Sequence, residues 1–65
     1  MSLSRIAEMQ NLLDNLKLEY EKFELKGNQV AGTRARKLLQ DIKTLSQDVR
    51  VQIQEIKRQK DAEGA

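Results

Sequence analysis

Apolar side chains recur at helical spacing along nearly the whole chain and are interrupted at residues 26–28. Before the interruption they step by three and four residues through Ile6, Met9, Leu13, Leu16, Tyr20 and Phe23. After it the same steps return through Ala31, Ala35, Leu38, Ile42, Leu45 and Val49, pass Gln52 and resume at Ile56. This repeat is typical of helices that bury one seam. The sequence therefore predicts two long helices.

The interruption contains the residues of a helix end and of a helix start. Gly27 can adopt the left-handed conformation that ends one helix, and Asn28 is a good N-cap for the next. Such a short connection folds the helices back on each other. We predict an all-α, antiparallel two-helix hairpin, a helical coiled coil that forms one domain over residues 1–65. Its expected parts are a helix over about 3–25, a turn at 26–28, a helix over about 29–60 and a frayed tail at 61–65.

Residue sizes near the turn agree with this pairing. In an antiparallel register, the bulky Tyr20 and Phe23 fall opposite Ala31 and Ala35, with Gly32 alongside. Large side chains facing small ones allow the helix backbones to approach closely. A glycine inside a helix costs about 1 kcal/mol, which a long helix tolerates. We therefore expect the second helix to continue through Gly32.

Additional apolar residues lie off the two seams and indicate a further packing partner. A lone two-helix hairpin is thermodynamically weak, because one seam barely offsets the conformational entropy lost on folding. We favour a homodimer with a four-helix arrangement, and a different protein covering the same surface is the alternative. The expected oligomer interface comprises Leu12, Leu18, Leu25, Leu39 and Ile53.

The composition excludes several classes of function. The chain has no Cys and no His, so imidazole or thiolate metal sites, disulfides and Ser–His or thiol catalysis are excluded. We expect no enzyme, no cofactor and no small-molecule substrate. The sequence contains no run of about 18 apolar residues, so it predicts no membrane span, and its N-terminus does not resemble a secretory signal. The expected location is the cytoplasm.

Charge is distributed unevenly along the chain, although the net charge is only +2. Residues 1–25 carry three basic and five acidic side chains, whereas residues 26–65 carry nine basic and five acidic ones. In the second helix one heptad position is basic four times in succession, at Arg36, Lys43, Arg50 and Lys57. These charges recur at about 10.5 Å and could follow a phosphate backbone. The alternative, an ordinary solvated coiled-coil face, stays open on this pattern alone.

One stretch adds a resemblance to a known family. The run KGNQVAGTRARK at residues 26–37, with Leu45 and Arg50 downstream, resembles the bacterial linker-histone-like family of nucleoid proteins, which includes the histone-like proteins of chlamydiae. The resemblance covers about residues 20–52. It implies DNA binding and compaction with little sequence preference. It would assign phosphate contacts to Lys26, Arg34, Arg36, Lys37 and Arg50.

Many members of that family carry a long tail rich in Lys and Ala, whereas this chain stops at residues 61–65, DAEGA. We therefore expect a tail-less version whose DNA binding is modest, sensitive to salt and dependent on oligomerisation.

Two functions follow as hypotheses. The first is a small nucleoid-associated, histone-like protein of the bacterial cytoplasm that contacts duplex DNA through Lys26, Arg34, Arg36, Lys37, Lys43, Arg50 and Lys57. The alternative is a coiled-coil adaptor with no role at nucleic acid, whose off-seam leucines dock on another helix. In the first case the geometry of the dimer decides how DNA is held. Basic edges on one face would coat one duplex, and edges on opposite faces would bridge two.

Overall fold

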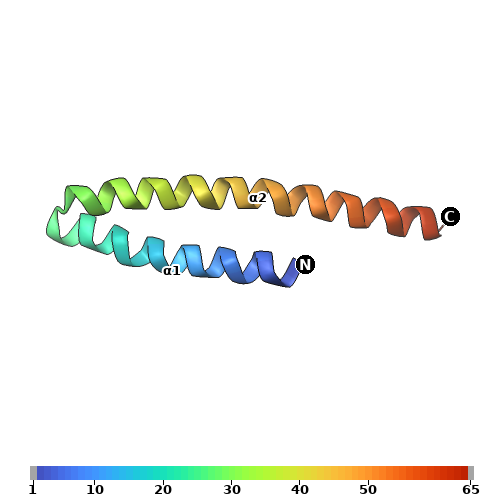
Figure 1. Cartoon of the computed structure of the whole chain (residues 1–65), viewed down its shortest axis with the longest axis horizontal. Helices are drawn as coiled ribbons and strands as arrows, with labels where there is room; N and C mark the ends of the chain where they lie inside the picture. The colour runs from blue at the N-terminus through green and yellow to red at the C-terminus, as the bar shows by residue number, and fades with distance from the viewer. Residues whose placement is uncertain (1, 65) are drawn as a thin grey trace.

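The chain folds into two antiparallel helices joined by a tight turn (Figure 1). The computed structural model describes residues 2–64, with side chains from residue 4 to 61. Helix α1 spans Ser2–Lys26 and α2 spans Gln29–Gly64, and no strand occurs in the part of the chain that is described. The all-α hairpin is confirmed. Helix α2 extends four residues past its expected end at 60, and Ala65 lies outside the described residues.

The turn forms through local hydrogen bonds that the sequence anticipates. Gly27 has a φ of 66°, and its N–H donates to the Phe23 carbonyl at 3.0 Å, which caps the end of α1. The Asn28 N–H reaches the Lys22 carbonyl at 3.3 Å. At the start of α2, Asn28 Oδ1 accepts from the Ala31 N–H at 3.2 Å. Both ends of the connection are therefore fixed by the residues that predicted them.

The predicted seam of α2 faces α1. Ala31, Ala35 and Leu45 are buried, and Leu38, Ile42, Val49 and Gln52 are half-buried. The last predicted member, Ile56, is 41% exposed, because α1 does not reach that far along α2. Close approach near the turn is also confirmed. A Cβ atom added at Gly32 would lie 2.6 Å from Phe23 Cδ1, so the ring occupies the space that any other residue would need. Helix α2 continues through Gly32 without a break.

The predicted seam of α1 is wrong in four of its six members. Ile6, Leu13, Tyr20 and Phe23 are 44%, 49%, 50% and 40% exposed. Half-buried positions on α1 are instead Arg5, Met9, Leu12, Leu16 and Glu19. The cause is that Leu12 and Leu13 are both apolar, so the apolar stripe of α1 is wider than one seam. The hairpin buries the half that contains Leu12 and leaves the other half outside.

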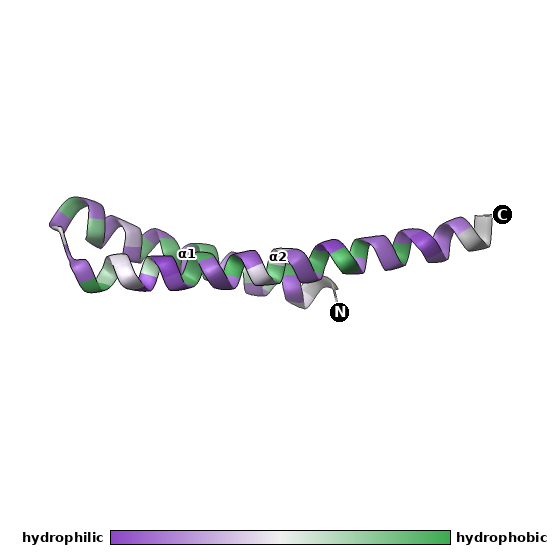
Figure 2. Cartoon of the chain, turned by 90° about the horizontal axis from the view of Figure 1, so that it is seen from above, coloured by the Kyte–Doolittle hydropathy of each residue, from purple (hydrophilic) through white to green (hydrophobic). Residues whose placement is uncertain are grey.

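The open end of the hairpin is joined by Arg5, whose Nη1 donates to the Asp48 carbonyl at 3.3 Å. Beyond this point α2 projects past the N-terminus of α1, and residues 53–61 are all exposed. The molecule is consequently a rod measuring 57 × 15 × 14 Å. Hydrophobic and hydrophilic residues alternate in short bands along both helices (Figure 2). This slender shape leaves most side chains accessible to a partner.

Candidate nucleic-acid interface

The four basic residues that recur every seven positions form one row on α2, which we call the basic row: Arg36, Lys43, Arg50 and Lys57. All four are exposed, and α2 is continuous from the first to the last. At 1.5 Å per residue the row is about 32 Å long, close to the length of one turn of duplex DNA. A rigid helix therefore presents four cations at regular intervals over that length.

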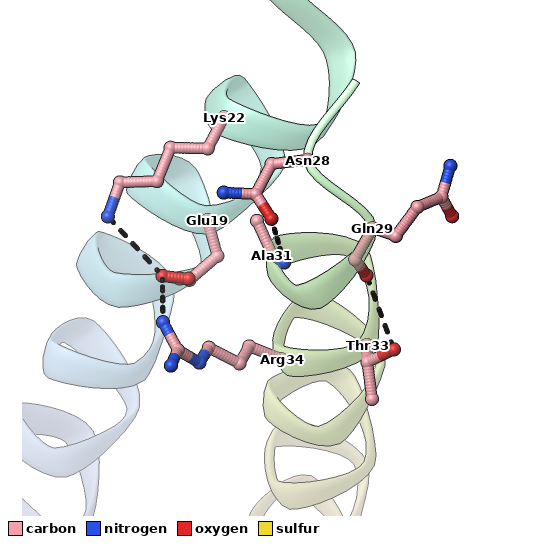
Figure 3. A network of polar contacts seen from close by, with 7 residues as sticks. All are labelled: Glu19, Lys22, Asn28, Gln29, Ala31, Thr33 and Arg34. Carbon is pink, nitrogen blue, oxygen red and sulfur yellow. Dashed lines mark hydrogen bonds and ion pairs between the residues drawn. The ribbon is translucent and has the colours of Figure 1, made fainter. Parts of the chain in front are cut away.

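A second group of charges lies beside the turn and connects the two helices (Figure 3). Lys22 Nζ and Arg34 Nη1 both approach Glu19 Oε1, at 3.6 and 3.7 Å. Glu19 is largely buried, with 13% of its side chain exposed, whereas the Lys22 and Arg34 side chains are 51% and 65% exposed. The carboxylate of α1 thus holds one cation from each helix.

The contacts at Glu19 are weak for a carboxylate so largely buried. Both distances exceed ordinary hydrogen-bond lengths, and ion pairs with exposed cations contribute about 0–1 kcal/mol. The other oxygen, Oε2, is buried and has no hydrogen-bond partner among the described residues. Glu19 is therefore incompletely satisfied where it lies.

These side chains border a groove of about 630 Å³, which we call the Glu19 groove. Its lining comprises Asn15, Leu18, Glu19, Lys22, Thr33, Arg34, Lys37 and Leu38. Lys37 is itself engaged, since its Nζ donates to Asp41 Oδ1 at 3.0 Å. Two of the predicted DNA contacts, Arg34 and Lys37, are thus held in intramolecular ion pairs on this side of the hairpin.

The opposite side of the hairpin is apolar. Leu13, Leu16, Lys17, Tyr20 and Leu39 line a groove of about 380 Å³, which we call the Tyr20 groove. An adjoining hollow shares Tyr20 and Leu39 and also contacts Arg36. Because successive helical residues differ by 100°, Arg34 and Arg36 point to different sides of α2. Arg36 therefore borders the Tyr20 groove, and Arg34 borders the Glu19 groove.

The acidity of the Tyr20 hydroxyl is altered by its surroundings on this side. A hydrogen bond from its hydroxyl to the Glu24 carboxylate raises its pKa, and the negative charge of Glu24 and partial desolvation act in the same direction. The phenol therefore stays neutral to a higher pH than an ordinary tyrosine does. Tyr20 is 50% exposed and presents the remaining ring surface outward.

The structure distributes the seven predicted DNA contacts over three places. The basic row contains four of them, the Glu19 groove contains Arg34 and Lys37, and Lys26 lies at the last residue of α1. All seven are exposed. Lys22, which the sequence reasoning missed, joins Arg34 through Glu19. Its three-residue spacing from Glu19, together with the antiparallel register, is the signal that could have identified it.

The five residues predicted as an oligomer interface do not share one surface. Leu12 is half-buried between the helices, and Leu18 lines the Glu19 groove. Leu25 is 76% exposed beside the turn. Leu39 lines the Tyr20 groove, and Ile53 is 57% exposed on the part of α2 that projects beyond α1. This prediction missed the exposed apolar residues that the sequence pattern assigns to the seams, namely Ile6, Leu13, Tyr20, Phe23 and Ile56.

Other kinds of site find no support in the described part of the chain. Nowhere among the side chains described, from residue 4 to 61, do three metal-ligating groups gather into a potential metal site. Neither helix, over the same residues, has an apolar stretch of the length and hydropathy needed to cross a bilayer. The chemistry that the structure presents is therefore that of charged and apolar surfaces.

Comparison with known families gives one match. The model of the family described as Histone H1-like protein Hc1 matches residues 3–59, which include both helices and the turn. Neither the comparison with curated proteins nor that with solved structures gave a match.

Proposed function

Because the chain belongs to the Histone H1-like protein Hc1 family, we propose that it is a nucleoid protein that binds duplex DNA through the phosphate backbone. The resemblance noted at residues 26–37 falls inside the matched region. Membership of the family supports DNA binding. We further propose that the basic row of α2 makes the contacts, without preference for sequence.

One feature of the basic row supports its role as the contact surface. The basic row is exposed along a straight, uninterrupted helix, and none of its four side chains takes part in a described ion pair. The row is about 32 Å long, so it spans nearly one turn of duplex DNA and can meet phosphates where the two strands pass beside the helix. Contacts to phosphate alone carry no base information. This geometry supports binding to any duplex.

The size of the effect follows from counterion release. Each neutralised phosphate adds about 0.9 to the slope of log affinity against log salt, so four contacts give a slope of about −3.6 per chain. Lys26 at the turn would raise this slightly. Binding is thus expected to be moderate at low salt and to weaken strongly between roughly 50 and 200 mM salt.

The decisive experiment compares two double variants with the same loss of charge. Lys43→Gln with Arg50→Gln removes two members of the basic row. Lys17→Gln with Arg58→Gln removes two exposed cations outside it. We expect the first pair to reduce the salt slope by about 2 per chain and the second to change it far less.

Fluorescence anisotropy with two unrelated duplexes at several salt concentrations measures both slopes. Equal losses from the two pairs would refute the row as the contact surface. No binding of the unaltered protein at about 50 mM salt would refute DNA binding itself.

A coiled-coil adaptor is the second candidate function, favoured by the exposed apolar side chains on both helices. Among the side chains that the structure describes, eleven large hydrophobic ones are at least 40% exposed. A foreign helix could cover them. This candidate requires a stable monomer, because a homodimer would occupy the same surface, so sedimentation analysis discriminates between the two.

A further inference from the structure

The Tyr20 side of the hairpin carries a set of exposed apolar residues that continue the hairpin interface outward. We call this set the Tyr20 face: Ile6, Leu13, Tyr20, Leu39 and Ile53. The three α1 residues are spaced by seven, and the two α2 residues by fourteen, so each set stays on one side of its helix. Their exposed fractions range from 44% to 57%.

From this face we propose that a second copy of the chain docks on the Tyr20 face with both turns at the same end, so that the two basic rows lie on opposite sides of a four-helix dimer. The inference rests on the proposed function only for its consequence, the bridging of two duplexes. The dimer and its orientation stand on the apolar and charge patterns alone.

The first argument for a second copy is the small core of one hairpin. Only Ala31, Ala35 and Leu45 are buried, and no large side chain is fully buried among the described residues. A hairpin with so small a core gains stability when a second hairpin covers its exposed apolar stripe. The Tyr20 face is continuous with the α1–α2 interface, since Leu16 and Ala35 border the same hollows as Tyr20. A second layer there would extend the existing core.

The second argument selects the orientation. A two-fold axis between the layers permits two arrangements. If the turns lie at opposite ends, α2 packs on the α2 of the second copy. The two basic rows, which border the Tyr20 face, would then lie along the same edge and place eight cations together. Like charges facing each other across an interface disfavour that pairing.

If the turns lie at the same end, α2 packs on the α1 of the second copy. The row of α1 that borders the Tyr20 face is Gln10, Lys17 and Glu24, whose net charge is zero. Each basic row then faces a neutral row, and the two basic rows point away from each other across the bundle. The repulsion between like charges is avoided in this arrangement, which is therefore favoured. Two rows on opposite sides contact two duplexes, not one.

Matched substitutions test which face is used. Leu39→Asp places a charge on the Tyr20 face, and Leu18→Asp places the same charge in the Glu19 groove, at nearly the same exposure, 52% against 58%. We expect sedimentation equilibrium to give a dimer for the unaltered chain and for Leu18→Asp, and a monomer for Leu39→Asp. A monomeric unaltered chain, or a dimer lost in Leu18→Asp and retained in Leu39→Asp, overturns the proposal and, in the first case, favours the foreign partner.

A second measurement does not depend on whether Leu39→Asp folds. The chain has no Cys, so Leu25→Cys gives one spin label beside each turn. With turns at the same end, the labels lie about 20 Å apart, a few helix diameters at most. With turns at opposite ends and overlap centred on Leu13, they lie about 40 Å apart. Pulsed electron paramagnetic resonance distinguishes these distances, and the longer one overturns the proposal.

Bridging is measured with one duplex fixed to beads and a second, labelled duplex in solution. The unaltered protein should carry the labelled duplex to the beads, and Leu39→Asp should reduce that recovery by at least about tenfold, since a monomer offers one row. Recovery undiminished in a monomeric variant overturns the bridging role. If no DNA binds at all while the dimer shows the short turn-to-turn distance, the proposed function fails and the dimer stands.

Discussion

The two sides of the hairpin differ in whether their charged side chains are paired and in whether their apolar side chains are exposed. On the Glu19 side, Arg34, Lys22 and Lys37 are engaged with carboxylates, and the groove between the helices is bordered by polar groups. On the Tyr20 side, apolar side chains remain exposed, and Arg36 of the basic row lies beside them. The Glu19 side of the helix pair therefore has cations that are neutralised within the chain. The Tyr20 side has exposed apolar side chains and a cation outside the described ion pairs. Internal ion pairs weaken a DNA surface, whereas unpaired rows strengthen it.

The largest expected effect comes from a substitution that disrupts the close approach of the two helices at Gly32 and Phe23, next to the Tyr20 groove. Gly32→Val would place a branched side chain against the Phe23 ring, where even a Cβ atom lies 2.6 Å from Cδ1. Overpacking of this kind costs about 1–3 kcal/mol, so we expect thermal unfolding followed by circular dichroism to show a loss near the upper end. Thr33→Val, exposed on the next residue, serves as the control and should change stability much less.

A companion change separates overpacking from the intrinsic helix preference of valine. Phe23→Leu in the Gly32→Val background should restore part of the lost stability, because a smaller side chain yields space to the new one. If the double variant regains no stability, the Phe23 ring is not the group for which Gly32 leaves space.

A smaller effect sharpens the contrast between the sides at Glu19. Glu19→Gln removes the charge that holds Lys22 and Arg34, whose two ion pairs are each worth about 0–1 kcal/mol. Released cations become available to phosphate, so we expect duplex affinity at low salt to rise by up to about tenfold. Anisotropy titrations measure this gain.

The control for Glu19→Gln is Asp14→Asn, which makes the same change in net charge at an exposed position of α1. It should raise affinity only slightly, through the overall charge of the chain. An equal gain from both variants would show that Glu19 has no specific hold on its cations, and the Glu19 side would then differ from the Tyr20 side only in its apolar content.

The contrast between the sides also shows what the sequence could predict. The turn and the α2 seam follow from local signals: a glycine at a left-handed position, an asparagine cap, and an apolar row flanked by polar residues. The rotation of α1 does not follow from local signals, because Leu12 and Leu13 belong to two adjacent stripes of similar hydrophobicity. Only the partner helix decides between them, and Glu19 facing Arg34 across the hairpin is part of that decision.

Two ion pairs on the Glu19 side differ in how far the sequence could predict them. Lys37 pairs with Asp41 four residues along the same helix, and this spacing is visible in the sequence. Arg34 pairs with Glu19 of α1, so this pair depends on the rotation of α1. Charge spacing along one helix predicts a row and its local pairs, whereas a pair across the hairpin depends on the neighbouring helix.

The turn fixes both sides at once, and its cap gives the next effect in size. Asn28→Ala removes the acceptor of the Ala31 N–H at the start of α2, and loss of an N-cap costs about 1 kcal/mol. Asn28→Ser retains an acceptor and should keep most of the stability. Urea unfolding at one protein concentration measures both. A loss as large in the serine variant would assign the effect to the turn backbone and not to the cap.

The smallest effect reads the Tyr20 side directly. Tyr20 is the single tyrosine of a chain without Trp or Cys, so its ultraviolet titration is free of overlap. The hydrogen bond to Glu24 raises its pKa above the ordinary value of about 10. A raised pKa in the folded state means that the associated stability is present below pH 10 and is lost as the pH rises through the folded value. Glu24→Gln should lower the midpoint of the Tyr20 titration toward 10.

Dilution should lower this midpoint as well if a second copy covers Tyr20, because undocking restores water to the phenolate. A midpoint that moves with Glu24→Gln but stays constant on dilution would place Tyr20 outside any interface between copies.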